Sequence, residues 1–129
     1  MARLRLGIYL EEDGPKIGRG KVRLLRAIRE HGSISAAARS MGMAYRHAWV
    51  MVDELNRCFR EPVVESTIGG RRGGGARLTS WGEELIERFE DIDRMASRAI
   101  GRQLAALERR IARVGRAPKR GAEGSRASR

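Results

Sequence analysis

The sequence has little cysteine and no long apolar run. Cys58 is the only cysteine among 129 residues, so the chain cannot close an internal disulfide or build a cysteine-rich zinc site. The N-terminus lacks the apolar stretch of a signal peptide, and no segment approaches the roughly 18 apolar residues of a membrane span. These absences predict a cytoplasmic protein that does not enter a membrane.

Patterns that carry catalysis are also missing from the sequence. We find no cluster of metal ligands at a recognisable spacing, no nucleophile beside a base and no nucleotide-binding motif. His47 has no second ligand at helical spacing, which argues against a metal there. The sequence therefore predicts no enzyme activity, no cofactor and no metal site.

Basic charge, by contrast, is abundant. Lys and Arg number 27 against 16 Asp and Glu, which gives a formal net charge of +11. Such a balance favours a polyanionic partner, namely DNA, RNA or an anionic membrane surface. Much of the excess is arginine, which makes bidentate contacts with phosphate and guanine better than lysine does.

Hydrophobic periodicity predicts the order of elements. Alternation indicates a strand over residues 4–10, and threefold and fourfold spacing indicates helices that follow it. We expect helices over about 18–30, 34–41 and 44–59, strands over 63–67 and 76–79 around a basic glycine-rich loop, and a last helix over 81–114. Ser80 and Glu83 have the spacing of a capping box for the last helix, and Gly101 should weaken or kink it.

Two short helices around a tight turn are the sharpest signal in the chain. Ser33 is suited to cap the first of them, small Ala37 and Ala38 let two helix backbones approach closely, and Gly42 permits the turn. This is the physical logic of a helix-turn-helix. The order strand, helix, helix-turn-helix, glycine-rich hairpin and long helix is more specific than the motif alone.

At these residues the sequence resembles the N-terminal DNA-binding domain of ModE-type molybdate-responsive regulators, which is related to the LysR-type helix-turn-helix. The matching segments, within roughly Leu4 to Ile111, are Gly32-Ser33-Ile34-Ser35 with Ala37-Ala38, Ala44-Tyr45-Arg46-His47-Ala48-Trp49, Gly69-Gly70-Arg71-Arg72-Gly73-Gly74-Gly75-Ala76-Arg77-Leu78-Thr79 and Gly82-Glu83-Glu84-Leu85-Ile86. The resemblance implies a mainly α (α+β) winged helix-turn-helix that binds double-stranded DNA and dimerises.

The sequence departs from the family pattern in two ways. Ala44 stands where the family usually has serine, so a cap of the recognition helix is lost. Full-length members also continue into molybdate-binding domains, which this sequence lacks, so the resemblance does not imply oxyanion sensing here. A separate ligand-sensing partner chain is one possibility that the family architecture suggests.

Candidate DNA contacts fall on three elements. A recognition helix presents its first residues to base edges in the major groove, whereas helix N-termini and basic wings contact phosphate or the minor groove. The candidates are Tyr45, Arg46 and His47 on the third helix, Ser33 and Ser35 at the start of the second, and Arg71, Arg72 and Arg77 on the wing. Trp49 is expected in helix packing, and Trp81 is expected to anchor the last helix.

The last helix is too long for a small core to cover its apolar stripe. Pairing with a second copy would bury that stripe, as in a coiled coil. The expected dimerisation residues are Leu85, Phe89, Ile92, Ala96, Ile100, Leu104, Leu107 and Ile111.

The predicted organisation is a DNA-binding domain over residues 1–80, a dimerisation helix over 81–114 and a disordered basic tail over 115–129. The function that fits is a sequence-specific transcription regulator acting as a nucleoid-associated homodimer. Two alternatives stay open: a non-specific architectural DNA-binding protein, and a module that keeps the fold but binds another protein through its long helix.

Overall fold

The computed structural model describes residues 1–67 and 74–112. Its elements are β1 (Gly7–Tyr9), β2 (Lys16–Gly18), α1 (Arg19–His31), α2 (Ile34–Ser40), α3 (Tyr45–Cys58), β3 (Val64–Thr67), β4 (Gly75–Leu78), α4 (Ser80–Ala99) and α5 (Gly101–Glu108). They form two compact units, one over Leu4–Ala96 and one that, within the described residues, joins Met1–Arg3 to residues 97–112.

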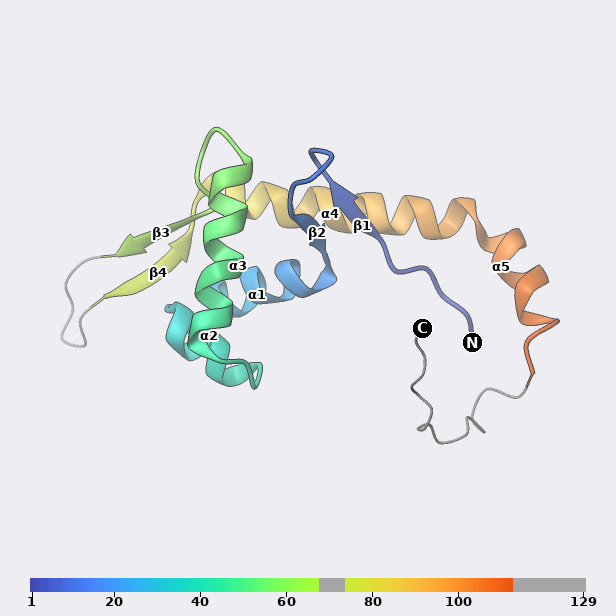
Figure 1. Ribbon diagram of the computed structural model, residues 1–129, viewed down its shortest axis with the longest axis horizontal. Helices are drawn as coiled ribbons and strands as arrows, with labels where there is room; N and C mark the ends of the chain where they lie inside the picture. The colour runs from blue at the N-terminus through green and yellow to red at the C-terminus, as the bar shows by residue number, and fades with distance from the viewer. Residues whose placement is uncertain (68–73, 113–129) are drawn as a thin grey trace. The chain divides into compact units, whose positions relative to one another are not determined.

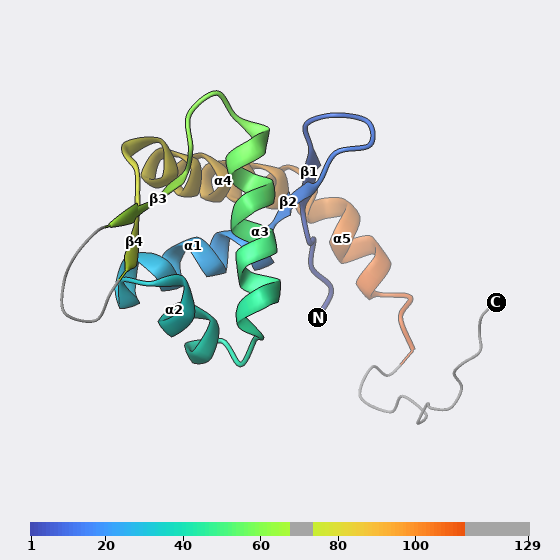
Figure 2. The ribbon, with the colours of Figure 1, turned by 60° about the vertical axis from the view of Figure 1, so that its left-hand side comes forward.

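The larger unit is built around α3. Figures 1 and 2 show the β3–β4 hairpin on one flank of α3 and the β1–β2 hairpin on the other, with α1 and α4 behind. Both hairpins are antiparallel two-stranded sheets, in which Ile8 pairs with Ile17 and Ser66 pairs with Ala76. The fold is the expected mainly α arrangement with a β-hairpin wing.

Alanines let the helices of the core pack closely. Ala37 and Ala48 are fully buried and Ala38 is nearly so, between the large side chains that α1 and α3 contribute. The buried hydrophobic residues are Ile17, Val22, Leu24, Leu25, Ala27, Ile28, Ala37, Ala38, Ala48, Val52, Leu55, Val63, Val64, Ala76, Leu85, Ile86 and Phe89. Burial of these side chains is the main source of stability of the unit.

The turns have the predicted chemistry. Gly32 ends α1 at φ 79° and Gly42 forms the turn before α3 at φ 66°, both in the left-handed region that favours glycine. The Ser33 hydroxyl caps α2 by accepting a 2.9 Å hydrogen bond from the Ala36 N–H. The predicted helices over 18–30, 34–41 and 44–59 are confirmed to within one or two residues at each end.

The N-terminal strand is shorter than predicted, and its partner was missed. Alternation indicated a strand over 4–10, but β1 covers only Gly7–Tyr9 and pairs with β2. The three residues of β2 are too few to show a period of two, so the sequence offered no pattern for this hairpin.

The helix predicted over 81–114 is not continuous within the described residues, and it is interrupted where Gly101 was expected to weaken or kink it. α4 ends at Ala99, Ile100 leaves helical geometry at φ −104° and ψ 11°, and α5 begins at Gly101. Glycine has the weakest helix propensity after proline, which accounts for a break at this point. Val114 and the predicted tail over 115–129 lie outside the described residues.

The predicted capping box of the last helix is also wrong. Thr79, one residue earlier than Ser80, accepts a 3.0 Å hydrogen bond from the Gly82 N–H through its hydroxyl. The Thr79 hydroxyl also donates to the Pro62 carbonyl at 2.7 Å, which ties the start of α4 to the segment before β3. Glu83 is not used for capping and instead pairs with Arg29 at 2.7 Å.

The first half of α4 belongs to the core of its own chain. Leu85, Ile86 and Phe89 are buried there, so the compact unit extends to Ala96 and passes the boundary expected at residue 80. Leu85 and Phe89 are therefore unavailable for the dimer contact predicted for them. No helix in the described part of the chain has the length and apolar character that crossing a membrane requires.

Candidate nucleic-acid interface

The N-terminal end of α3 projects polar and aromatic side chains away from the core. Tyr45 is 55% exposed, and Arg46 and His47 are also exposed, whereas Ala48 behind them is fully buried. Ala44 has no hydroxyl and, as predicted, provides no side-chain cap. The first N–H groups of α3 therefore have no hydrogen-bond acceptor from the Ala44 side chain. The structure thus brings the three predicted contact residues of this helix together at one exposed end.

The start of α2 lies beside the same surface. Ser35 is exposed and lines a groove that also includes Tyr45 and the wing residues Gly74 and Gly75. Ser33 is half-buried, and its hydroxyl oxygen is engaged as the cap of α2. Ser35 is consequently the freer of the two hydroxyls for a phosphate oxygen.

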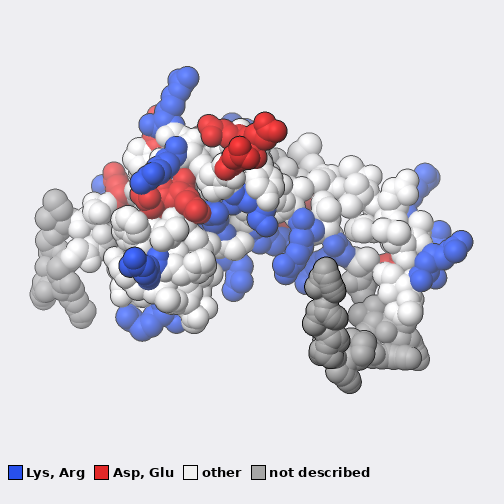
Figure 3. All heavy atoms as spheres, viewed as in Figure 1, with Lys and Arg blue, Asp and Glu red and all other residues white. Residues whose placement is uncertain are grey.

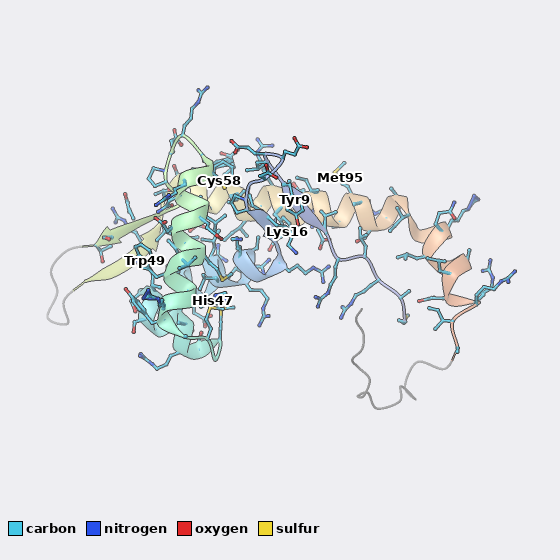
Figure 4. All side chains as sticks on the ribbon, in the orientation of Figure 1. Tyr9, Lys16, His47, Trp49, Cys58 and Met95 are labelled. Atoms are coloured by element: carbon cyan, nitrogen blue, oxygen red, sulfur yellow. The ribbon has the colours of Figure 1, made fainter. Side chains whose placement is uncertain are left out.

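Trp49 corrects an expectation about packing. It was predicted in helix packing, but it is 47% exposed and lines the groove between α3 and the wing, one helical turn after Tyr45. Figure 4 shows Trp49 on the flank of α3 that faces the wing. Its helical phase relative to Ala48 could have suggested this, because Ala48 is the inward-facing residue and its neighbours point elsewhere.

The wing is fastened to the helix-turn-helix at its base. The Ala76 N–H donates a 2.9 Å hydrogen bond to the carbonyl of Gly32, the residue that ends α1. A side chain on Gly75 would lie 2.8 Å from that carbonyl oxygen and 2.6 Å from the Thr67 hydroxyl, so only glycine fits there. The hairpin therefore holds a fixed position relative to α2.

Asn56 fixes the start of the wing to α3. Its Oδ1 accepts from the Val63 N–H at 2.7 Å and from the Val64 N–H at 3.2 Å, while its Nδ2 donates to the Val64 carbonyl at 3.1 Å. One amide thus satisfies three main-chain groups where the chain enters β3. Sequence reasoning missed this residue, because an asparagine late in a helix looks like ordinary surface polarity.

Gly82 allows α4 to approach β3. A Cβ at this position would overlap the Val63 carbonyl oxygen, which also accepts a 3.0 Å hydrogen bond from the Thr79 N–H. Trp81 packs edge-on against Phe59, with ring centroids 5.1 Å apart, and so anchors the start of α4 as expected. These contacts place the wing at a fixed position between α3 and α4.

Arg77 is the one predicted wing contact within the described residues. It is 69% exposed, and its Nε donates to the Glu65 carboxylate across the hairpin at 2.9 Å. Glu65 thereby orients Arg77 along the hairpin surface and neutralises part of its charge. Arg71 and Arg72 lie outside the described residues.

Charge is distributed unevenly along α3. In Figure 3, Lys and Arg side chains gather over α2 and the N-terminal end of α3, whereas Asp and Glu side chains gather over the middle of α3 and the β1–β2 turn. Asp53 pairs with Arg57 at 3.1 Å on the same helix. The basic end of α3 is the end that carries Tyr45, Arg46 and His47.

A capped short helix, a glycine turn, an exposed second helix and a hairpin wing define the winged helix-turn-helix class of fold. A solved structure with this fold is the Multiple Antibiotic Resistance Repressor, MarR, which matches with a TM-score of 0.52 over 72% of each chain at 17% identity. Residues 20–83 match the pattern of the bacterial regulatory helix-turn-helix proteins of the LysR family. Residues 20–83 thus carry a LysR-type helix-turn-helix domain, similar to the one at the N-terminus of ModE-type regulators.

Proteins with similar sequences support the assignment of this domain to the ModE type. The molybdenum-pterin-binding protein MopA of Rhodobacter capsulatus is 44% identical over 87 residues, which are 67% of this chain and 33% of MopA. MopB of the same organism is 46% identical over 67% of this chain and 32% of its own length. The DNA-binding transcriptional dual regulator ModE of Escherichia coli is 35% identical over 61% of this chain and 30% of its own length. The chain spans about a third of the length of these relatives.

Proposed function

We propose that this chain is a sequence-specific DNA-binding transcription regulator. The observation that carries the proposal is the exposed N-terminal end of α3. Tyr45, Arg46 and His47 are exposed there, and Ala48, which follows them, is fully buried and holds the helix on the core. An α-helix presented in this way fits the B-DNA major groove, which is about 12 Å wide. The net charge of +11 adds attraction to the phosphate backbone.

Each element then has a role in recognition. Arg46 is suited to donate to guanine O6 and N7, and Tyr45 and His47 to base edges or phosphates beside it. Ser35 and the N-terminus of α2 approach a phosphate, and Arg77 with the rest of the wing approaches the backbone or the minor groove. Asn56 and Gly75 contact no DNA in this scheme, but they hold the wing in a position from which it can contact the DNA backbone or the minor groove.

We further propose that the regulator is a homodimer. Beyond the buried Leu85 and Phe89, α4 exposes 43% of Ile92 and 67% of Met95, and α5 exposes 61% of Leu107. Ile111 is 45% exposed, and Ala96, Ile100 and Leu104 are half-buried. Apolar surface of this kind is a feature of subunit contacts. Two recognition helices one DNA turn, about 34 Å, apart would read a partly palindromic site.

The test is a selection of bound fragments from a random duplex library, with the affinity for the winner measured across a salt series. Enrichment of an inverted repeat that binds far more tightly than random duplex is the expected result. The variant Arg46→Ala should then relax the preference at one position of each half-site. Tight binding without enrichment, weakened equally for all sequences by salt, would favour the non-specific architectural alternative.

A further inference from the structure

A second basic surface lies on the flank of α3 opposite the wing. It is a cleft between the β1–β2 hairpin and the beginning of α1, lined by Arg5, Lys16, Arg19 and Lys21, with Met51 of α3 as one wall. Figure 4 shows Lys16 on this side of α3 and Trp49 on the other. Figure 3 shows Lys and Arg side chains below β1 and β2.

Two of the four basic side chains in this cleft are neutralised within the protein. Arg19 pairs with Asp93 of α4 at 2.9 Å, and Lys21 pairs with Glu54 of α3 at 3.3 Å. Across residues 1–67 and 74–112, no carboxylate lies within ion-pair distance of Arg5 or Lys16. The cleft therefore keeps two uncompensated positive charges.

Gly7 makes room for the Lys16 side chain. A Cβ on Gly7 would lie 2.5 Å from Lys16 Cδ and 3.0 Å from its Cγ, so the lysine stem runs over the bare backbone of its neighbouring strand. The two strands pair Gly7 with Gly18 and Tyr9 with Lys16. Packing of the stem limits the freedom of Lys16 and keeps its ammonium near the cleft.

The local electrostatics of α1 are unfavourable to folding as they stand. The first turn of α1 has no acidic residue, and its N-cap, Gly18, supplies no side-chain hydrogen bond. Basic groups near the positive end of a helix dipole repel it. Arg19 and Lys21 are compensated by their ion pairs, but within the described residues Arg5 and Lys16 are not, and uncompensated positive charge beside a helix N-terminus is typical of a surface that binds an anion.

The position of the cleft relative to α3 indicates which anion. Successive residues of an α-helix are about 100° apart, so Met51 and Trp49 point about 160° away from each other around the axis. A helix in the major groove is bordered by a sugar-phosphate strand on each side. With α3 in such a groove, the wing and the start of α2 would face one strand, and the basic cleft would face the other.

We propose that Arg5 and Lys16 form a phosphate-binding site that takes a backbone phosphate of the DNA strand opposite the one approached by the wing. The inference rests on the proposed DNA-binding function and adds a second point of attachment to it. Phosphate contacts on both strands would fix how deeply α3 enters the major groove and at which angle it lies there. Phosphate contacts of this kind fix register without reading sequence.

The test compares two double variants that lose the same charge. Arg5→Gln with Lys16→Gln empties the cleft, and Arg60→Gln with Arg88→Gln removes two exposed arginines beyond the C-terminal end of α3 and on α4. Affinity for a short duplex of mixed sequence is measured across a sodium chloride series. The slope of log affinity against log salt should fall in magnitude by at least about 1 in the cleft variant and stay unchanged in the control.

Free phosphate is the other source of the same chemistry, and a second arm separates the two. Melting temperatures of wild type and both variants are compared in sodium phosphate and in sodium chloride of equal ionic strength. Equal salt slopes for the two variants would overturn the DNA assignment, and a rise in melting temperature specific to phosphate would then identify a free-anion site. A wild-type protein that binds no duplex would overturn the proposed function itself.

Discussion

Asn56 illustrates how one side chain can organise a binding surface without belonging to it. Its amide satisfies the Val63 N–H and both main-chain groups of Val64 at the entry to β3. These groups are part of a buried segment, since Val63 is fully buried and Val64 is 5% exposed. An unpaired main-chain group in such a place costs free energy comparable to a lost hydrogen bond.

Replacement of Asn56 by alanine should lower the free energy of unfolding by about 1–3 kcal/mol, because two N–H groups lose their acceptor. Asn56→Asp keeps the acceptor and loses only the donor to the Val64 carbonyl, so its effect should be smaller. Urea denaturation of the two variants and wild type measures the difference. Equal stability of Asn56→Ala and wild type would mean that water replaces the amide at no cost.

Cys58 offers a second test at the scale of one residue. Burial raises the pKa of its thiol, the nearby Glu11 and Glu54 raise it further, and Lys21 opposes them. Because the folded pKa is the higher one, the thiol form is favoured by folding, and this contribution is lost as pH rises through the folded pKa. Alkylation by iodoacetamide at mildly alkaline pH should be slower in the folded protein than in urea. Equal rates would show that the thiol is freely solvated.

Among the elements, α1 and α4 are joined by a series of ion pairs along their exposed edges. Arg19 pairs with Asp93, Arg26 with Glu90 and Arg29 with Glu83, so positions that advance along α1 meet positions that recede along α4. Each pair is partly exposed and contributes little alone. Together they favour one antiparallel register of the two helices over the buried Leu85 and Phe89.

The break between α4 and α5 leads to a prediction about helix content. Gly101 has φ outside the left-handed region, and a Cβ added there meets nothing within 4 Å. Gly101→Ala should therefore favour a continuous helix by about 1 kcal/mol and raise the far-ultraviolet helical signal. Gly20→Ala, near the start of α1 and also in open space, is the control at a place where helix already forms. No gain over the control would show that something other than glycine ends α4.

Sequence periodicity predicted the helices well because their inward faces are continuous. Val22, Leu25 and Ile28 repeat on α1, and Ala48, Val52 and Leu55 on α3, so the apolar stripe specifies both the element and its buried face. The hairpin of β1 and β2 and the cap at Thr79 depend instead on contacts between distant segments. The exposure of Trp49 follows from its helical phase relative to Ala48, but its place beside the wing depends on how distant segments pack, which the local pattern of α3 does not contain.

At the scale of the whole molecule, the exposed side of α4 is where the proposed dimer can be tested. Met95, 67% exposed and absent from the predicted stripe, lies one turn beyond Ile92. Ile92→Glu with Met95→Glu should convert a dimer into a monomer in sedimentation at micromolar concentration, because charge at a dimer contact cannot be desolvated cheaply. Glu87→Gln with Arg94→Gln changes exposed charges on the same helix and should leave the dimer intact. A dimer that survives the first pair would place the contact elsewhere.

Because the Ala76 N–H donates to the Gly32 carbonyl, changes at the base of the wing and changes in the connection between Thr67 and Gly74 have different consequences for the fold. The foot of the hairpin is specified by that bond, by Gly75 and by the pairing of Val64 with Leu78. None of these depends on how many residues connect Thr67 to Gly74. Evolution can therefore change the length or the charge of that connection, and with it the DNA contacts of the wing, without disturbing the packing of the helices beneath it.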